Sequence, residues 1–251
     1  SCWADSSSLS LYDLQLKTIA LLCLSTMARP RSDIGRIQYR DVHFHMDSNH
    51  DPTGVVIHFR VPKETQVKTI KLAMHSDRQI CPVLTLFVFR QKSEHLRNKL
   101  PSDHTLFLSY IECPSKTSSA RASTVSNWVK DIMKKSGVDT EVYKPHSIRS
   151  AASTKAVQKG HSIQAVKEHA NWSLTSNTFE KFYYKPTDQS LQSTAIVDSI
   201  FSTSENAITL GVEMEPTEID LVTTNNLNVG EMKTNNVIVS HPLYRRWLGF
   251  Q

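Results

Sequence analysis

The stretch KPHSIRSAASTKAVQKG, residues 144–160, places a histidine and an arginine three positions apart, directly after a proline and ahead of a run of small residues. The proline and the Ala-rich run predict a helix that begins near His146. Residues three apart share a helix face, so His146 and Arg149 are expected to project together. A helix N-terminus attracts anions, and this pair therefore predicts an anion site. Taken alone, the spacing also fits a surface arginine and a half-buried histidine.

Charge is unevenly distributed along the chain. The 251 residues include 29 Lys+Arg and 24 Asp+Glu, a net charge of +5. Residues 187–251 contain 8 acidic and 3 basic side chains, which leaves 26 basic and 16 acidic ones, a net +10, in residues 1–186. A basic body joined to an acidic tail favours a polyanionic partner such as nucleic acid over a neutral metabolite.

The cysteines and the apolar segments narrow the class of protein further. Cys2, Cys23, Cys81 and Cys113 are scattered, without the paired spacing of a zinc site or the density of a disulfide scaffold. No apolar run reaches membrane-spanning length, and no basic-then-apolar leader opens the chain. We therefore expect reduced thiols in a soluble intracellular protein without a membrane partner.

The first part of the chain predicts one buried helix followed by a small sheet. Residues 11–28 are apolar almost all round from Ile19 to Leu24, which is typical of a core helix. Residues 37–45, 55–61 and 67–72 are short, rich in β-branched and aromatic residues and separated by turn signals, so they predict an antiparallel sheet. Lys63 falls on the hairpin loop between the last two strands.

The second part predicts mainly helices and then a tail. Helical patterns cover residues 81–96, 123–137 and 162–170 and, beyond Ser176, a segment on which Tyr183 shares a face with phenylalanines while Tyr184 points elsewhere. One more amphipathic helix is expected at residues 190–202. From residue 203 the chain loses periodicity. The sequence therefore predicts an α+β domain over residues 1–202 and an acidic, largely flexible tail over residues 203–251.

Candidate site residues follow one another in a specific order. An arginine comes after the buried helix, then a hairpin lysine, then H-x-x-R, then a histidine and a tryptophan, and last a tyrosine pair: Arg29 or Arg31, Lys63, His146, Arg149, His169, Trp172, Tyr183 and Tyr184. This order resembles the catalytic domain of the tyrosine recombinases, also called the phage integrase family, over about residues 10–200. The resemblance implies a mainly helical fold with a small antiparallel sheet, and no metal or other cofactor.

Two departures from the family pattern leave alternatives open. One extra residue separates Arg29 from Asp33, so either Arg29 or Arg31 could fill the first arginine position; we favour Arg29, which directly follows the buried helix. The interval from Trp172 to the tyrosines is longer than in most bacterial members. The F-x-x-F-Y register favours Tyr183 as nucleophile, and Tyr184 is the alternative.

The resemblance implies site-specific DNA recombination or integration through a 3′-phosphotyrosyl intermediate. Two guanidinium groups can stabilise the negative charge of a phosphorane without a metal. A tyrosine needs a cationic field or a base to become a good nucleophile. The resemblance implies that Arg29 and Arg149 clamp the phosphate, that His146 is the base and that Lys63 is the acid. It also implies that Trp172 or His169 is a further donor or packing group, and that Tyr183 is the nucleophile.

The motifs RPRSD, CPV and W-S-x-x-x-x-T-F-x-x-F-Y most closely resemble those of the eukaryotic branch of the family, which is carried by Crypton and DIRS-like mobile elements. This branch implies a transposable element and a nuclear location. The family also implies duplex DNA as partner and a homo-tetramer on two paired DNA sites, with a monomer expected in solution.

Three other functions compete with recombination. A domesticated, catalytically silent DNA-binding protein would keep the basic body without using Tyr183. A type IB topoisomerase shares the chemistry and acts on one strand. A metal-dependent hydrolase is suggested by His43 and His45, which alternation would place on one face of a strand, but no carboxylate cluster accompanies them.

Overall fold

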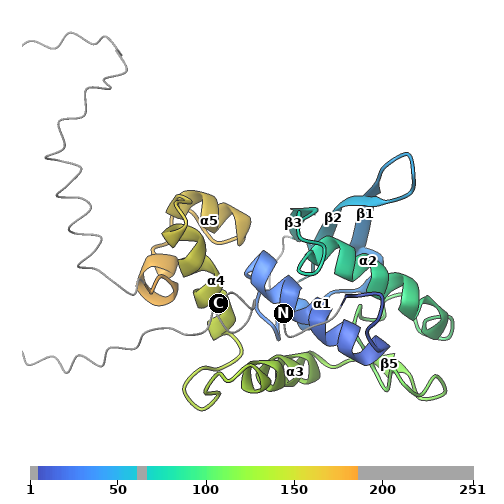
Figure 1. Cartoon of the computed structure of the whole chain (residues 1–251). Helices are drawn as coiled ribbons and strands as arrows, with labels where there is room; N and C mark the ends of the chain where they lie inside the picture. Colours follow the sequence, from blue (N-terminus) through green and yellow to red (C-terminus); the bar gives the residue numbers. More distant parts are fainter. Residues whose placement is uncertain (1–4, 61–66, 186–251) are drawn as a thin grey trace, which may run out of the picture. The chain divides into compact units, whose positions relative to one another are not determined.

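The structure, a computed structural model, describes residues 5–60 and 67–185 (Figure 1). The η elements are 3₁₀ turns except the last, which is a π-helical turn. In chain order the elements are α1 (Leu11–Thr26), η1 (Ile34–Arg36), η2 (Tyr39–Asp41), β1 (Val42–Met46), β2 (Pro52–Phe59), β3 (Lys68–Ala73), α2 (Pro82–Ser93), η3 (Glu94–Leu96), β4 (Leu108–Ser109), β5 (Ser118–Ser119), α3 (Ala122–Lys135), α4 (Ser147–Gln158), α5 (Ile163–His169) and η4 (Phe179–Tyr183).

Three of the strands form one antiparallel sheet in the order β1-β2-β3. Ile57, at its centre, pairs with Val42 on one side and with Ile70 on the other, and all three side chains are buried on the same face. Helix α2 packs against β2 and β3, so the apolar side of the sheet is covered (Figure 1). The alternating pattern of the sequence therefore corresponds to a covered face and an open face.

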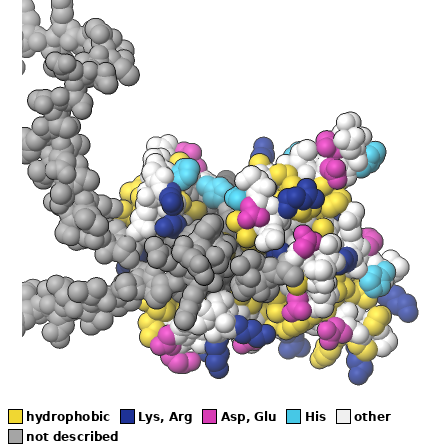
Figure 2. All heavy atoms as spheres, viewed as in Figure 1, with side chains coloured by type: hydrophobic (Ala, Val, Ile, Leu, Met, Phe, Trp, Pro, Cys, Tyr) yellow, Lys and Arg dark blue, Asp and Glu magenta, His cyan; other side chains and the backbone are white. Residues whose placement is uncertain are grey.

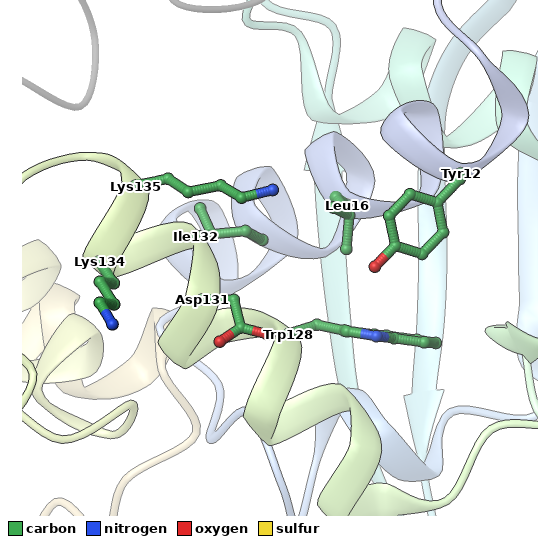
Figure 3. A pocket seen from close by; sticks show the side chains of 7 residues that line it. All are labelled: Tyr12, Leu16, Trp128, Asp131, Ile132, Lys134 and Lys135. Carbon is green, nitrogen blue, oxygen red and sulfur yellow. The ribbon is translucent and has the colours of Figure 1, made fainter.

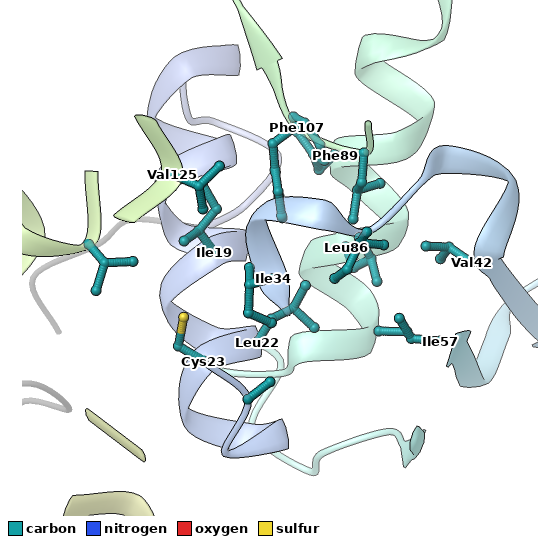
Figure 4. Packing of buried hydrophobic residues seen from close by; sticks show 14 of the residues in the cluster. Ile19, Leu22, Cys23, Ile34, Val42, Ile57, Leu86, Phe89, Phe107 and Val125 are labelled. Carbon is teal, nitrogen blue, oxygen red and sulfur yellow. The ribbon is translucent and has the colours of Figure 1, made fainter. Parts of the chain in front are cut away.

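The main core is built around α1. Its N-cap Ser10 accepts a hydrogen bond from the backbone N–H of Asp13, and almost every side chain from Leu14 to Cys23 is buried. Figure 4 shows side chains of α1, α2, α3, η1 and the sheet converging on this helix. A helix packed on all sides needs little amphipathic character, which explains why its sequence is apolar all round.

A second, smaller core lies where α4, α5 and η4 meet the end of α1. It is formed by five buried side chains, Met27, Ala152, Val166, Ala170 and Phe179, which come from four separate segments. Figure 1 shows α4 and α5 next to each other, with the orange turn η4 beside them. This second core holds the segments that carry the H-x-x-R pair and the tyrosines.

The predicted fold class is confirmed, with local corrections. The first strand, predicted at residues 37–45, begins only at Val42: residues 39–41 form the 3₁₀ turn η2, and Gln38 makes an isolated bridge to Thr105. The segment around Tyr183 is a π-helical turn rather than an α-helix. The Lys63 loop, the predicted helix at 190–202 and the tail at 203–251 lie outside the described residues.

The surface charge, the thiols and the hydropathy of the helices each bear on the class of protein predicted from the sequence. On the face shown in Figure 2, blue Lys and Arg side chains are interspersed with magenta Asp and Glu, so net charge alone does not mark a DNA-binding face there. Cys23, Cys81 and Cys113 are free thiols, and burial raises the pKa of Cys23 far above its usual range. Among the described helices, none is both long and apolar enough to cross a lipid bilayer.

Candidate active site

Arg149 is a buried guanidinium whose hydrogen-bonding capacity is mostly unused by the described residues. It lies in the first turn of α4 and is 5% exposed. One Nη lies 3.8 Å from Oδ2 of Asp33, and the other donates a 3.4 Å hydrogen bond to the carbonyl oxygen of Ala170. Its Nε is buried and finds no hydrogen-bond partner within residues 5–60 and 67–185. Buried donors are normally paired, so this group points to a missing acceptor.

The charge of Arg149 survives its burial. Its pKa is lowered to about 10, mainly because burial removes water from the guanidinium; Asp33 and Tyr183 act in the opposite direction, and the neighbouring Arg29 adds to the lowering. A pKa of about 10 still leaves the group cationic at neutral pH. A buried, charged and under-bonded guanidinium is suited to hold an anion.

Asp33 joins Arg29 to Arg149. The chain leaves α1 at Met27, whose left-handed backbone (φ 51°) redirects it into a tight turn. Within this turn, the carboxylate of Asp33 accepts hydrogen bonds from the backbone N–H of Arg29 at 2.8 Å and from its Nε at 3.1 and 3.2 Å. Arg29 is thereby held beside Arg149, whereas Arg31 is exposed. The geometry thus favours Arg29 as the first arginine.

Aromatic rings complete the surroundings of Arg149. Its Cζ lies 4.0 Å from the ring centroid of Trp172 and 5.7 Å from that of Tyr183. The Trp172 ring lies 4.8 Å from the ring of Phe179 and 5.1 Å from the ring of Tyr183, between centroids. A cation over these ring faces is attracted by their negative quadrupole. Trp172 therefore packs against the Arg149 guanidinium and the Tyr183 ring.

The π-helical turn η4 presents the two tyrosines differently. The carbonyl oxygen of Tyr183 accepts hydrogen bonds from Ser150 and, at 3.1 Å, from Thr154. The backbone N–H of Tyr184 bonds to Phe179 at 2.9 Å, which is the i to i−5 bond of a π turn. The Tyr184 ring packs 5.9 Å from that of Phe179, while the Tyr183 ring faces Trp172 and Arg149. Position thus favours Tyr183.

The two candidate histidines are both exposed. His146 is the N-terminal cap residue of α4, where its carbonyl oxygen accepts a 3.1 Å hydrogen bond from the N–H of Arg149. Nε2 of His169, at the end of α5, lies 2.6 Å from the carbonyl oxygen of Ser25, so this nitrogen carries the proton. This hydrogen bond links the end of α5 to the end of α1 and occupies the Nε2–H donor of His169.

Lys63 lies outside the described residues, but the strand that follows its hairpin reaches the site. Nδ2 of Asn171 donates a 3.3 Å hydrogen bond to the carbonyl oxygen of Thr69, in β3. Asn171 immediately precedes Trp172 and has a left-handed backbone (φ 52°). The base of the hairpin is therefore in contact with the loop that carries the tryptophan.

The structure also reveals residues that were not among the predicted site residues. Asp33 was recognised only as part of the arginine segment, although an acid four residues after an arginine could have indicated an ion pair. Ser150 and Thr154 were recognised only as small residues, although their i, i+4 spacing puts two hydroxyl groups on one helix face. Lys167, 5% exposed, binds Glu180 at 3.1 Å, and nothing in its local sequence indicated this contact.

Two further features stand apart from this site. His43 and His45 share the open face of β1 as predicted, and the His43 ring lies 5.5 Å from that of His58, but the described residues contain no group of three or more potential metal ligands. A pocket of about 150 Å³ between α1 and α3 is lined by none of the predicted site residues. Its walls are Tyr12, Leu16, Trp128, Asp131, Ile132, Lys134 and Lys135 (Figure 3).

Comparisons with solved structures show which proteins share this fold. The chain is similar to XerA recombinase, with 18% identity and a TM-score of 0.51 over 74% of this chain and 57% of that one. It is also similar to XerH site-specific recombinase in a post-cleavage complex with palindromic difH substrate, with 16% identity and a TM-score of 0.55 over 78% of this chain and 49% of that one. The chain spans about half the length of these proteins, and the likeness shows the fold.

Sequence comparison identifies the family. No curated protein is significantly similar to the chain in sequence. The sequence model described as "Phage integrase family" matches residues 4–190, which is most of the chain and includes every predicted site residue. The chain therefore belongs to the phage integrase family, whose members are tyrosine recombinases.

Proposed function

We propose that this chain is the catalytic domain of a site-specific DNA recombinase that cuts and rejoins DNA through a 3′-phosphotyrosyl intermediate. The observation that carries the proposal is the group around Arg149: a buried, charged guanidinium whose Nε has no hydrogen-bond partner among the described residues, beside a second arginine and facing a tyrosine ring. A DNA phosphate would supply the missing acceptor. The same phosphate would then lie next to the nucleophile.

In the proposed reaction, Oη of Tyr183 attacks the phosphorus and His146 takes the phenolic proton. Arg29 and Arg149 donate hydrogen bonds to the nonbridging oxygens, where the phosphorane is most negative. The bond to the 5′ oxygen then breaks, and Lys63 gives that oxygen a proton. The 3′ phosphate remains on Tyr183, so a 5′ hydroxyl can attack it and restore the DNA strand without an external energy source.

The exposed position of His146 is compatible with a base that meets its substrate at the surface. In the proposed complex, DNA lies over the N-terminus of α4, where the partial positive charge of the helix favours a phosphate. DNA binding would desolvate the site and strengthen its electrostatic interactions. Trp172 supports Arg149 by packing rather than as the principal donor.

The partners and the biological setting are part of the proposal. XerH has been solved with its difH substrate before and after cleavage, which supports duplex DNA as the partner of this related fold. We propose assembly as a homo-tetramer on two paired sites. The Crypton and DIRS-like wording of RPRSD and CPV supports an origin in a eukaryotic mobile element and a nuclear location. We propose residues 1–202 as the catalytic unit and 203–251 as an accessory acidic tail.

Covalent capture tests this proposal without knowledge of the target sequence. A pool of nicked duplexes of random sequence is incubated with the full chain in EDTA, and complexes that survive boiling in detergent are isolated. At a nick the freed 5′ fragment diffuses away, so the phosphotyrosine accumulates. Wild type is expected to yield an adduct with enriched sequences, and Tyr183→Phe is expected to yield none because it removes only the nucleophilic oxygen.

Tyr184→Phe is the matched control, because it deletes the same oxygen one residue along and is expected to retain the adduct. The reverse pattern would transfer the nucleophile to Tyr184. Adducts without sequence enrichment, together with relaxation of supercoiled plasmid by the wild type, would indicate a topoisomerase. Absence of any adduct, with noncovalent DNA binding retained, would overturn recombination in favour of a silent DNA-binding protein.

A further inference from the structure

Two hydroxyl groups of α4 hold the main chain of the tyrosine segment. Ser150 Oγ and Thr154 Oγ1 both donate to the carbonyl oxygen of Tyr183, and Thr154 Oγ1 also accepts a 2.9 Å hydrogen bond from the backbone N–H of Lys185. These contacts bridge segments that are 29 to 33 residues apart in the chain. They hold the two peptide groups that flank Tyr184, the first of which contains the carbonyl group of Tyr183.

The same helix also carries the phosphate-binding arginine. Ser150 directly follows Arg149, and Thr154 lies one turn further along α4. Arg149 is anchored by its contacts to Asp33 and Trp172, so its position relative to the two hydroxyl groups is fixed by one rigid turn of helix. The distance between the Tyr183 backbone and the guanidinium is therefore set by α4 together with the contacts of Arg149 to Asp33 and Trp172.

A π-helical turn makes such anchoring necessary. Its i to i−5 hydrogen bonds are rarer and less stable than those of an α-helix, and η4 is only five residues long. Without an external contact, this turn could relax toward an α-helical turn and rotate the tyrosine away from Arg149. The small side chain of Ala152, buried in the same cluster as Phe179, allows close approach between α4 and η4.

We propose that Ser150 and Thr154 are positioning residues, which hold the main chain of Tyr183 at a fixed distance from the phosphate-binding guanidinium of Arg149. The inference rests on the proposed function and adds to it two side chains that touch neither substrate nor reacting atoms. Displacing a reacting group by about 1 Å can cost on the order of a hundredfold in rate. Loss of the pair should therefore slow cleavage while leaving the phosphate-binding groups in place.

The test uses the full chain with the Ser150→Ala/Thr154→Val double substitution, and it has two independent readouts. The first is hydrogen–deuterium exchange of residues 179–185 in the DNA-free protein, which is expected to accelerate about tenfold as the N–H of Lys185 loses its acceptor. The second is the single-turnover rate of covalent adduct formation at saturating nicked duplex. This rate is expected to fall at least tenfold, with unchanged noncovalent DNA affinity.

Two controls separate positioning from folding. Ser153→Ala deletes a buried hydroxyl of the same helix whose hydrogen bonds go only to the carbonyl oxygens of Arg149 and Ser150, so both readouts are expected to match wild type. Thr154→Ser keeps the hydroxyl and should restore most of the cleavage rate that Thr154→Val loses.

Each result bears on one proposal. Unchanged exchange in the double variant would refute the hydroxyl anchor whether or not the protein cleaves DNA. Faster exchange with an unchanged cleavage rate would refute its positioning role. If wild type forms no adduct at all, recombination is rejected, and the exchange measurement alone decides whether the anchor exists.

Discussion

Replacing Asp33 with asparagine should weaken the fold by removing the carboxylate shared by two arginines. Asp33 is 7% exposed, and Asn has nearly the same shape, so the change removes a charge and little packing. Opposite charges about 4 Å apart interact by about 4 kcal/mol at an effective dielectric constant near 20, and desolvation offsets part of this. We expect roughly 2–3 kcal/mol from the loss of the contact with Arg149, which is buried.

The contact of Asp33 with Arg29 contributes less. The Arg29 side chain is 40% exposed, so water screens the pair, and its loss is expected to cost about 1 kcal/mol or less. The sum, about 3 kcal/mol, corresponds to a Tm lowered by roughly 6–12 °C in a domain of this size. Thermal unfolding monitored by circular dichroism measures this directly.

Asp131→Asn supplies the matched control, because it removes the same charge from an exposed position on α3 and is expected to change stability by about 0.5 kcal/mol or less. A double-mutant cycle with Arg149→Met assigns the cause: with the arginine gone, Asp33→Asn should cost little more. The explanation fails if the Tm of Asp33→Asn equals that of Asp131→Asn, or if the two substitutions are additive.

Three further outcomes are expected. Gly35→Ala should destabilise the fold by about 1–3 kcal/mol in urea unfolding, because a Cβ there would lie 2.9 Å from the Cα of Ala122; unchanged stability would show that this turn can move away. Lys167→Met should lower the free energy of unfolding by about 3 kcal/mol, because the carbonyl groups of Leu174 and Ser176 and the carboxylate of Glu180 lose their donor. Glu180→Gln should lower it less, since the Glu180 side chain is 35% exposed. Deleting residues 203–251, which hold 6 acidic and 3 basic side chains, should tighten DNA binding by a few fold at low salt in fluorescence anisotropy, and weaker binding would contradict competition by the tail.

Local signals predicted the elements that carry the site. The proline and small residues around His146 predicted the start of α4, and the apolar run of residues 11–28 predicted the buried α1, because helix ends and full burial leave strong marks in sequence. The strand predicted at residues 37–45 was wrong in its first half, since β1 begins at Val42. Its β-branched and aromatic residues satisfy a strand pattern, but tertiary contacts with the segment around Thr105 bend the backbone into a 3₁₀ turn.

The finer geometry of the site was beyond sequence patterns. Helical spacing predicted that Tyr183 would share a face with Phe179 and Phe182, but Phe182 is exposed and the tyrosine ring that packs on Phe179 is that of Tyr184. The spacing could not predict the π turn, whose last carbonyl group accepts hydrogen bonds from hydroxyl groups 29 and 33 residues earlier in the chain. The preference for Arg29 over Arg31 likewise depends on where the Asp33 carboxylate lies, which only the folded chain determines.

The two separate hydrophobic cores have a consequence for cooperativity. Asp33 adjoins Ile34 of the first core, whereas Arg149 contacts Trp172 and Tyr183, which pack on the second. The five buried residues of the second core include two alanines and offer modest apolar area. Residues 147–185 are thus expected to open as a subunit of the fold at lower free energy than the rest. An anion bound by both Arg29 and Arg149 would link the two cores, so its binding free energy would add to the stability of residues 147–185. Cleavage at a wrong position would then be disfavoured for two reasons, since a poorly bound phosphate neither neutralises the two arginines nor stabilises the contact between the two cores.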